Sequence, residues 1–124
     1  MKQLLLTTIA AVVLVGCGGP SIHKASETGN IEAVKQHIAA GTDVNVKDDA
    51  LEWTPLFIAA AWGHKEVVEL VIANGADVNA TDDGGKTPLD EATHPDNPNA
   101  SAEIADLLRK HGGKAGEQLK SKVK

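Results

Sequence analysis

Three segments of the chain carry apolar residues at helical spacing, each bounded by polar residues and glycine. The apolar positions are Ile31, Val34 and Ile38 in the first segment, Val67, Val68, Leu70, Val71 and Ile72 in the second, and Ile104, Leu107 and Leu108 in the third. Intervals of three and four residues place such side chains on one face of an α-helix. We therefore expect three amphipathic helices that each bury one face.

The sequence also repeats itself at intervals of 33 or 34 residues. The segment GTDVN at 41–45 recurs as GADVN at 75–79, and TPL at 54–56 recurs at 87–89. Threonine is a good helix N-cap, and proline is tolerated at the first helical position. Each apolar helix ends at a glycine, which suits a left-handed C-cap. Self-similarity at this period predicts a solenoid of stacked supersecondary units.

These motifs resemble ankyrin repeats, over about residues 21–113. The resemblance divides this part of the chain into repeats at about 21–49, 50–82 and 83–113. It implies an all-α fold, a short ankyrin-repeat solenoid of three repeats with paired antiparallel helices and β-hairpin loops. Val44 and Val78 are the buried residues expected at the hairpins.

The departures from the repeat pattern predict where the stack differs from a regular one. Repeat one lacks the TPL motif and repeat three lacks DVN, so both are expected to be caps. The first hairpin, 46–53, is longer than standard, and prolines in the extra segment 94–99 predict a protruding loop. His23 and His64 occupy places where ankyrin histidines make structural hydrogen bonds between loops. Phe57 takes the motif histidine's place in repeat two and is expected to pack inward, and Asp90 takes it in repeat three.

The N-terminal segment reads as a targeting signal. Lys2 precedes an uncharged, mostly apolar run of twelve residues, Leu4 to Val15, which reaches about 18 Å as a helix. That length is short of the bilayer's hydrocarbon core of about 30 Å, so a cleaved signal fits better than a membrane span. Residues 14–17 (LVGC) resemble the lipobox of bacterial lipoproteins, against the alternative of an ordinary signal with a chance cysteine.

The lipobox resemblance implies removal of residues 1–16 and lipidation of Cys17, which with residues 18–20 forms a short tether of about 13 Å. The family pattern at Gly18 implies the outer membrane, facing the periplasm, if the cell has two membranes. The tail, 114–124, is polar and basic. We expect a disordered end, with contact to an anionic membrane or an acidic partner as the alternative.

Composition excludes several classes of function. The chain has 12 basic and 17 acidic residues, and residues 21–113 alone carry 7 and 16, a net charge of -9. That balance argues against nucleic acid as a partner. A single cysteine excludes an internal disulfide or a CxxC metal site.

No convincing catalytic group, cofactor site or metal site is present in the sequence. His94 and Asp96 are two weak metal ligands on one loop. The run 82–85 (DDGG) fits a hairpin turn better than a calcium loop.

The functional surface is therefore expected to be the concave face that ankyrin proteins use, made from hairpin tips and inner helices. Mapped onto this sequence, the partner-binding positions are Glu27, Ala50, Leu51, Trp53, Ala61, Trp62, Asp83, Lys86 and His94. Tryptophan is enriched at binding hot spots. Two interpretations stay open for each one: Trp53 either binds a partner or covers its hairpin base, and Trp62 either binds a partner or packs on Thr93–His94.

The sequence thus predicts a monomeric, membrane-anchored protein-binding module. Trp53, Trp62 and Leu51 would be its apolar anchors, and four hairpin acids would favour a basic partner: Asp48, Asp49, Asp82 and Asp83. One alternative is a dedicated inhibitor or immunity protein for a periplasmic toxin or enzyme. Another, less favoured, is a metal-binding or enzymatic protein.

Overall fold

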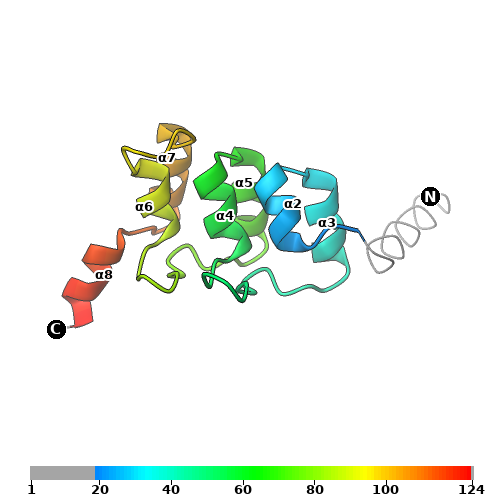
Figure 1. The fold of residues 1–124 in the computed structure, drawn as a ribbon, viewed down its shortest axis with the longest axis horizontal. Coiled ribbons are helices and arrows are strands. Elements are labelled where there is room, and N and C mark those ends of the chain that lie inside the picture. Colours follow the sequence, from blue (N-terminus) through cyan, green and yellow to red (C-terminus); the bar gives the residue numbers. More distant parts are fainter. Residues whose placement is uncertain (1–18, 124) are drawn as a thin grey trace.

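The computed structural model describes residues 19–123, so the expected signal and Cys17 lie outside the described part. Three helix pairs stack side by side along the long axis (Figure 1). Their bounds are α2 Ile22–Thr28 with α3 Ile31–Ala39, α4 Pro55–Trp62 with α5 Lys65–Ala73, and α6 Pro88–Thr93 with α7 Ala102–Lys110. The inner helix α4 packs between α2 and α6, and the outer helix α5 contacts both α3 and α7. The all-α solenoid of three repeats is confirmed.

The inner helices of repeats two and three begin as the TPL motif predicts. The Thr54 hydroxyl oxygen accepts a hydrogen bond from the Phe57 N–H at 3.2 Å, and Pro55 occupies the first turn of α4. Thr87 and Asp90 form a reciprocal capping box at the start of α6. A capping hydroxyl stabilises a helix by about 1 kcal/mol, so each motif fixes its helix start locally.

The core is built from small and β-branched side chains. Alanines at 25, 59, 60 and 92 are buried on the inner helices and let neighbouring helices approach closely. Phe57 is buried, as predicted. Val44 is buried, but the prediction for Val78 is wrong, because this side chain is only half-buried. Val78 packs against the edge of the core as a partly buried side chain.

The hairpins of the described residues are turns without β-strands, so the expected β-hairpin loops are corrected to tight turns. Each is closed by a backbone hydrogen bond, from the Asp48 N–H to the Trp53 carbonyl at 3.0 Å and from the Asp82 N–H to the Lys86 carbonyl at 2.9 Å.

One asparagine in each DVN motif joins its repeat to the next. The Asn45 side chain donates to the Gly75 carbonyl at 3.1 Å and accepts from the Asp77 N–H at 2.7 Å. The Asn79 side chain makes the equivalent bonds, to the Gly112 carbonyl at 3.1 Å and from the Lys114 N–H at 2.8 Å. The repeated motif therefore sets the register between repeats.

The expectation of a disordered tail from residue 114 is wrong, because the chain continues into helix α8, Gly116–Val123. The Gly116 N–H donates to Asp90 Oδ2 at 2.9 Å, and the Thr87 hydroxyl donates to the Lys114 carbonyl at 2.6 Å. Gly116 is buried, and a side chain there would collide with the Gly85 carbonyl. Asp90 thus attaches the start of the extension to repeat three.

Candidate protein-binding groove

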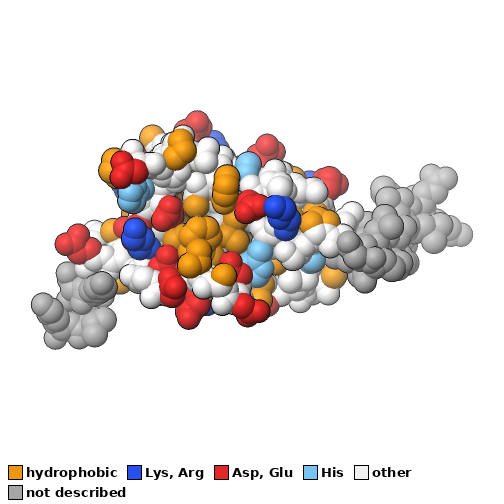
Figure 2. All heavy atoms as spheres, in the orientation of Figure 1, with side chains coloured by type: hydrophobic (Ala, Val, Ile, Leu, Met, Phe, Trp, Pro, Cys, Tyr) orange, Lys and Arg blue, Asp and Glu red, His pale blue; other side chains and the backbone are white. Residues whose placement is uncertain are grey.

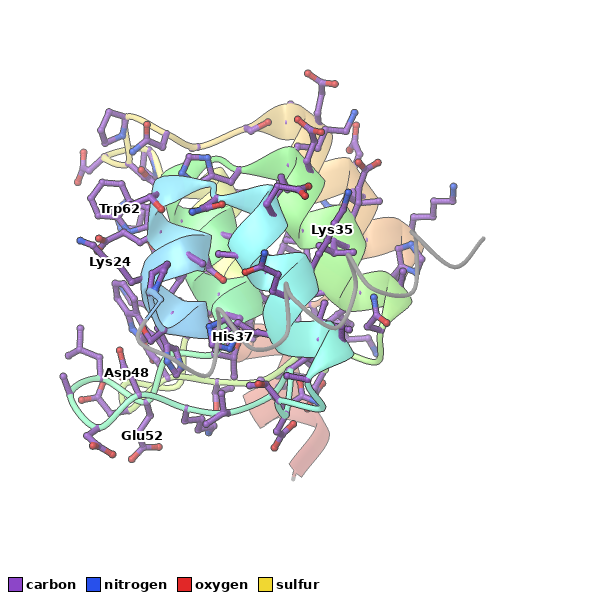
Figure 3. All side chains as sticks on the ribbon, turned by 90° about the vertical axis from the view of Figure 1, so that its right-hand side faces the viewer. Lys24, Lys35, His37, Asp48, Glu52 and Trp62 are labelled. Atoms are coloured by element: carbon purple, nitrogen blue, oxygen red, sulfur yellow. The ribbon has the colours of Figure 1, made fainter. Side chains whose placement is uncertain are left out.

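A groove of about 350 Å³ lies between α2, the first hairpin and α4. We call it the Trp62 groove, and its lining residues are His23, Lys24, Glu27, Asp48, Leu51, Trp53, Ile58 and Trp62. Figure 2 shows apolar side chains gathered at the centre of this face, with acidic side chains beside them. Figure 3 places Trp62, Lys24 and Asp48 along one edge of the molecule, away from Lys35 on an outer helix.

The apolar part of the groove is exposed to solvent. Among the described residues the exposed large hydrophobic side chains are Leu51, at 43%, and Trp62, at 45%, and both line this groove. Ile58, which precedes Trp62 by one helical turn on α4, is buried and lines the groove with them. Exposed apolar side chains that gather within a polar rim mark interaction surfaces. This groove therefore carries the main hydrophobic signal on the described surface.

The two tryptophans have different surroundings. The Trp53 indole N–H donates to Asp82 Oδ2 at 3.3 Å, and its ring centroid lies 4.9 Å from that of Phe57 at an interplanar angle of 33°. Trp53 therefore ties the first hairpin to the second and also covers the inner-helix start. The Trp62 side chain is partly exposed at the end of α4, and residues of α2 line the same groove. Trp62 is the more available anchor.

Two histidines support the groove through structural hydrogen bonds, as predicted. His23 Nε2 donates to the Val46 carbonyl at 2.8 Å, which joins α2 to the first hairpin. His64 Nε2 donates to the Glu27 carbonyl at 2.8 Å, which joins repeat two to the end of α2. Both rings fix the backbone around the groove.

Two of the four hairpin aspartates expected to set the charge also build the turns. Asp48 Oδ1 accepts from the Leu51 and Trp53 N–H groups at 3.0 and 3.2 Å. Asp82 Oδ1 accepts from the Gly84 and Lys86 N–H groups, both at 2.9 Å, which confirms the hairpin-turn interpretation of 82–85. Asp49 and Asp83 are exposed.

The Asp48 carboxylate keeps its charge through these contacts. Burial acts to raise its pKa, but the hydrogen bonds from the Leu51 and Trp53 backbone and the nearby His23 ring outweigh burial, so the pKa lies below its ordinary value. Beside it, Lys24 Nζ pairs with Glu27 Oε1 at 2.7 Å. The groove therefore has a fixed negative charge at its hairpin side and a compensated pair at its helix side.

The structure divides the predicted binding residues into two groups. Glu27, Leu51, Trp53 and Trp62 line the Trp62 groove, whereas Lys86 and His94 line a second groove of about 550 Å³. The other residues that line the second groove are Gly84, Gly85, Asp90, Thr93, Pro95, Gly116 and Glu117. Helix α8 contributes the last two, which the sequence did not predict.

The remaining predicted positions line neither groove. Ala50 and Asp83 lie exposed at the hairpin tips. The Ala61 carbonyl accepts from the Asn97 side chain at 2.9 Å, so Ala61 anchors the loop at 94–99. That loop is present where predicted, and it is fastened to α4.

Sequence reasoning did not place Lys24 or Ile58 in the groove. Both could have been found by helical spacing, because Lys24 precedes Glu27 by three residues and Ile58 precedes Trp62 by four. Asp48 was expected for its charge alone. Its role in the turn depends on the conformation of the longer hairpin, where Glu52 adopts a positive φ of 61°.

The described residues contain no cluster of three or more His, Cys, Asp or Glu side chains that could hold a metal ion. His94 Nδ1 accepts from the Asp96 N–H at 3.1 Å, so the His94–Asp96 segment forms a local turn. The grooves therefore offer shape and charge for recognition.

Comparison with known proteins agrees with this architecture. A model described as ankyrin repeats matches residues 22–118 in three copies. The chain is also 51% identical over 47 residues to protein phosphatase 1 regulatory subunit 12A of Mus musculus, and equally to that of Rattus norvegicus. This match covers 37% of the chain and 4% of either subunit. Because the repeat model covers most of the sequence and the three helix pairs stack as its period predicts, the chain belongs to the ankyrin repeat family.

Proposed function

We propose that this protein binds a partner protein through the Trp62 groove. Ankyrin repeats are typically non-catalytic protein-interaction modules, and the mouse and rat relatives are named as regulatory subunits. The observation that carries the proposal is the position of Leu51 and Trp62. These two exposed large apolar side chains lie on the same groove, at the inner face of the stack. Partly exposed aromatic anchors of this kind dominate binding energy at interfaces.

The proposed partner presents a basic surface. Residues 21–113 carry a net charge of -9, and three of their acids, Asp48, Asp49 and Glu52, lie in the first hairpin with Leu51. Complementary charge speeds association most at low salt. Both ends of the stack are free of exposed large hydrophobic side chains within the described residues, which favours a monomer.

The proposed location is a bacterial cell envelope, with the protein anchored by lipid on Cys17. The support is the lipobox-like LVGC sequence; residues 1–18 lie outside the described part. Within residues 19–123, no helix combines the length and apolar character that crossing a bilayer requires. His37 Nε2 donates to the Pro20 carbonyl at 2.7 Å, which holds the start of the described chain against α3.

The anchor has a geometric consequence. In Figure 1, α2 and α3 lie at one end of the stack and α8 lies at the other. A short tether before Pro20 would therefore bring repeat one closest to the membrane. Incorporation of a labelled fatty acid that is lost in Cys17→Ala would support the anchor, and unchanged labelling would contradict it. Outer-membrane fractionation then tests the periplasm-facing location.

The binding proposal is tested by crosslinked pull-down from membranes with the native protein and Trp62→Ala. Glu66→Ala, an exposed change on outer helix α5, is the control. We expect a partner that Trp62→Ala loses and Glu66→Ala keeps, with equal circular dichroism for all three proteins. A partner kept by Trp62→Ala would contradict the groove as the site. A single partner enzyme whose active site is blocked would identify the inhibitor or immunity alternative.

A further inference from the structure

We propose that the Trp62 groove takes a linear peptide segment of the partner, with one large apolar side chain flanked by Lys or Arg. This inference rests on the proposed function and specifies the chemistry of the occupant. The proposed occupant is thus an unfolded or helical tail of the partner, and a broad folded surface is the alternative.

The size of the groove favours one anchoring side chain. Its volume of about 350 Å³ is at the small end of the range of about 300–1,000 Å³ typical of sites that enclose a compact ligand. A folded partner normally covers about 800 Å² of each surface. The exposed apolar side chains here are Leu51 on the hairpin and Trp62 on α4, with Ile58 beneath. One apolar side chain of a peptide can contact all three.

The charges around the anchor position favour flanking cations. Glu27 and Asp48 line the groove, and the Asp83 N–H donates to the Leu51 carbonyl at 3.1 Å, which places Asp83 beside the hairpin. Asp49 lies in the same turn as Leu51. The lysine that lines this groove, Lys24, is paired with Glu27. A cation beside the anchor on the hairpin side would meet the carboxylates of Asp48, Asp49 and Asp83, whereas an acidic flank there would be repelled.

The second groove lacks this combination. Lys86, Asp90 and Glu117 line it, a mixture of charges similar to that of Lys24, Glu27 and Asp48 in the Trp62 groove. Neither of the exposed large hydrophobic side chains of the described residues lines it. The two grooves therefore differ in their exposed apolar side chains, and the preference for an apolar anchor belongs to the Trp62 groove.

Selection from a displayed random peptide library against the purified full-length protein tests the inference. We expect retained peptides to share Leu, Ile, Met, Phe or Trp next to Lys or Arg. Measured by fluorescence anisotropy with a retained peptide, Trp62→Ala should weaken binding about tenfold or more. The double change Asp49→Asn/Asp83→Asn should weaken it a few-fold at low salt and flatten its salt dependence. The charge-matched control Glu66→Gln/Asp106→Asn, on the outer helices, should leave the peptide affinity and its salt dependence unchanged.

The outcomes separate this inference from the function on which it rests. Retained peptides that are acidic, or that lack a large apolar residue, would overturn the proposed chemistry. An empty selection, together with a membrane partner that Trp62→Ala loses, would overturn the linear segment but keep the groove. If Trp62→Ala changes neither the binding of the retained peptides nor the capture of the membrane partner, both proposals are overturned. Circular dichroism and thermal unfolding of every variant must match the native protein.

Discussion

The two junctions between repeats share one contact and differ in the others. At each, a DVN asparagine donates to a glycine carbonyl and accepts a backbone N–H of the next repeat. On the inner side, the first junction uses His64, seated against Gly29 and bonded to the Glu27 carbonyl. The second uses Asn97, from the inserted loop, bonded to the Ala61 carbonyl.

The first junction also carries the Trp62 groove on its inner face. There His64 joins repeat two to the end of α2, and Leu51 and Trp62 are exposed in the groove. The second groove lies between repeat three and the C-terminal extension, where the second hairpin and α6 meet the start of α8. The repeated motif fixes the stacking, and the inserted segments determine the surface.

The largest expected effect comes from crowding the first junction. Gly29 has φ of 74°, and a Cβ there would lie 2.7 Å from His64 Nδ1, so Gly29→Ala strains the backbone and displaces the His64 ring. Left-handed strain costs about 1–2 kcal/mol and the lost hydrogen bond about 1 kcal/mol. Urea denaturation should show a loss of about 2–3 kcal/mol in unfolding free energy. Gly41→Ala, at φ of 86° with open space around it, should lose only the part of the unfolding free energy that comes from backbone strain. Equal losses for both would contradict the role of His64.

The asparagine bridges should contribute equally to the two junctions. Asn45→Ala and Asn79→Ala each remove two exposed hydrogen bonds between neighbouring repeats. Each should lower the unfolding free energy by about 1–2 kcal/mol, measured by the same denaturation. A loss confined to one variant would show that the two junctions are not equivalent.

Asp48 should make the first hairpin sensitive to acid. Because its pKa is lowered in the folded state, it stabilises the fold fully above its unfolded pKa of about 3.9, and this contribution is lost as pH falls through the lower folded value. Asp48→Asn should therefore have a flatter stability curve below about pH 4 than the native protein. Asp49→Asn removes the adjacent charge but leaves the bonds of Leu51 and Trp53 intact. An equally flattened curve for Asp49→Asn would contradict the assignment to Asp48.

The smallest expected effect belongs to the outer side of the second junction. Lys65 on α5 pairs with Glu103 on α7 at 3.1 Å, and the hydrogen bond and charge of Glu103 raise the pKa of Lys65. Such a raised pKa stabilises the fold at pH values below the unfolded value near 10.5, and the effect fades as pH rises through the folded value. Both side chains are exposed, so Lys65→Ala should leave the melting temperature nearly unchanged at neutral pH. A large, salt-sensitive drop would show that this pair stabilises the junction.

Local sequence signals predicted most of the fold. The TPL and DVN motifs recur at a fixed period, and their caps act within four residues, so the helix starts of α4 and α6 follow from nearby residues. The structure of the tail could not be predicted from local sequence, because α8 has no repeat pattern and its start is fixed by Asp90, 26 residues earlier.

The candidate site was predicted less completely than the fold. Concave positions could be mapped from the repeat, but the repeat pattern could not distinguish Trp53 from Trp62. That distinction depends on Asp82, which lies 29 residues from Trp53 in the chain and reaches its indole N–H. The division into two grooves likewise depends on an inserted loop and on α8, whose placement comes from long-range contacts.

Site-specific photocrosslinking in living cells tests the central claim most directly. A bulky aromatic photoreactive amino acid, which keeps an apolar ring at the anchor position, replaces Trp62 on the inner face in one protein and Lys35 on outer helix α3 in another. The account predicts a discrete crosslinked partner from position 62 and none of that size from position 35. The same partner from position 35 alone, or equally from both positions, would contradict the Trp62 groove as the binding site.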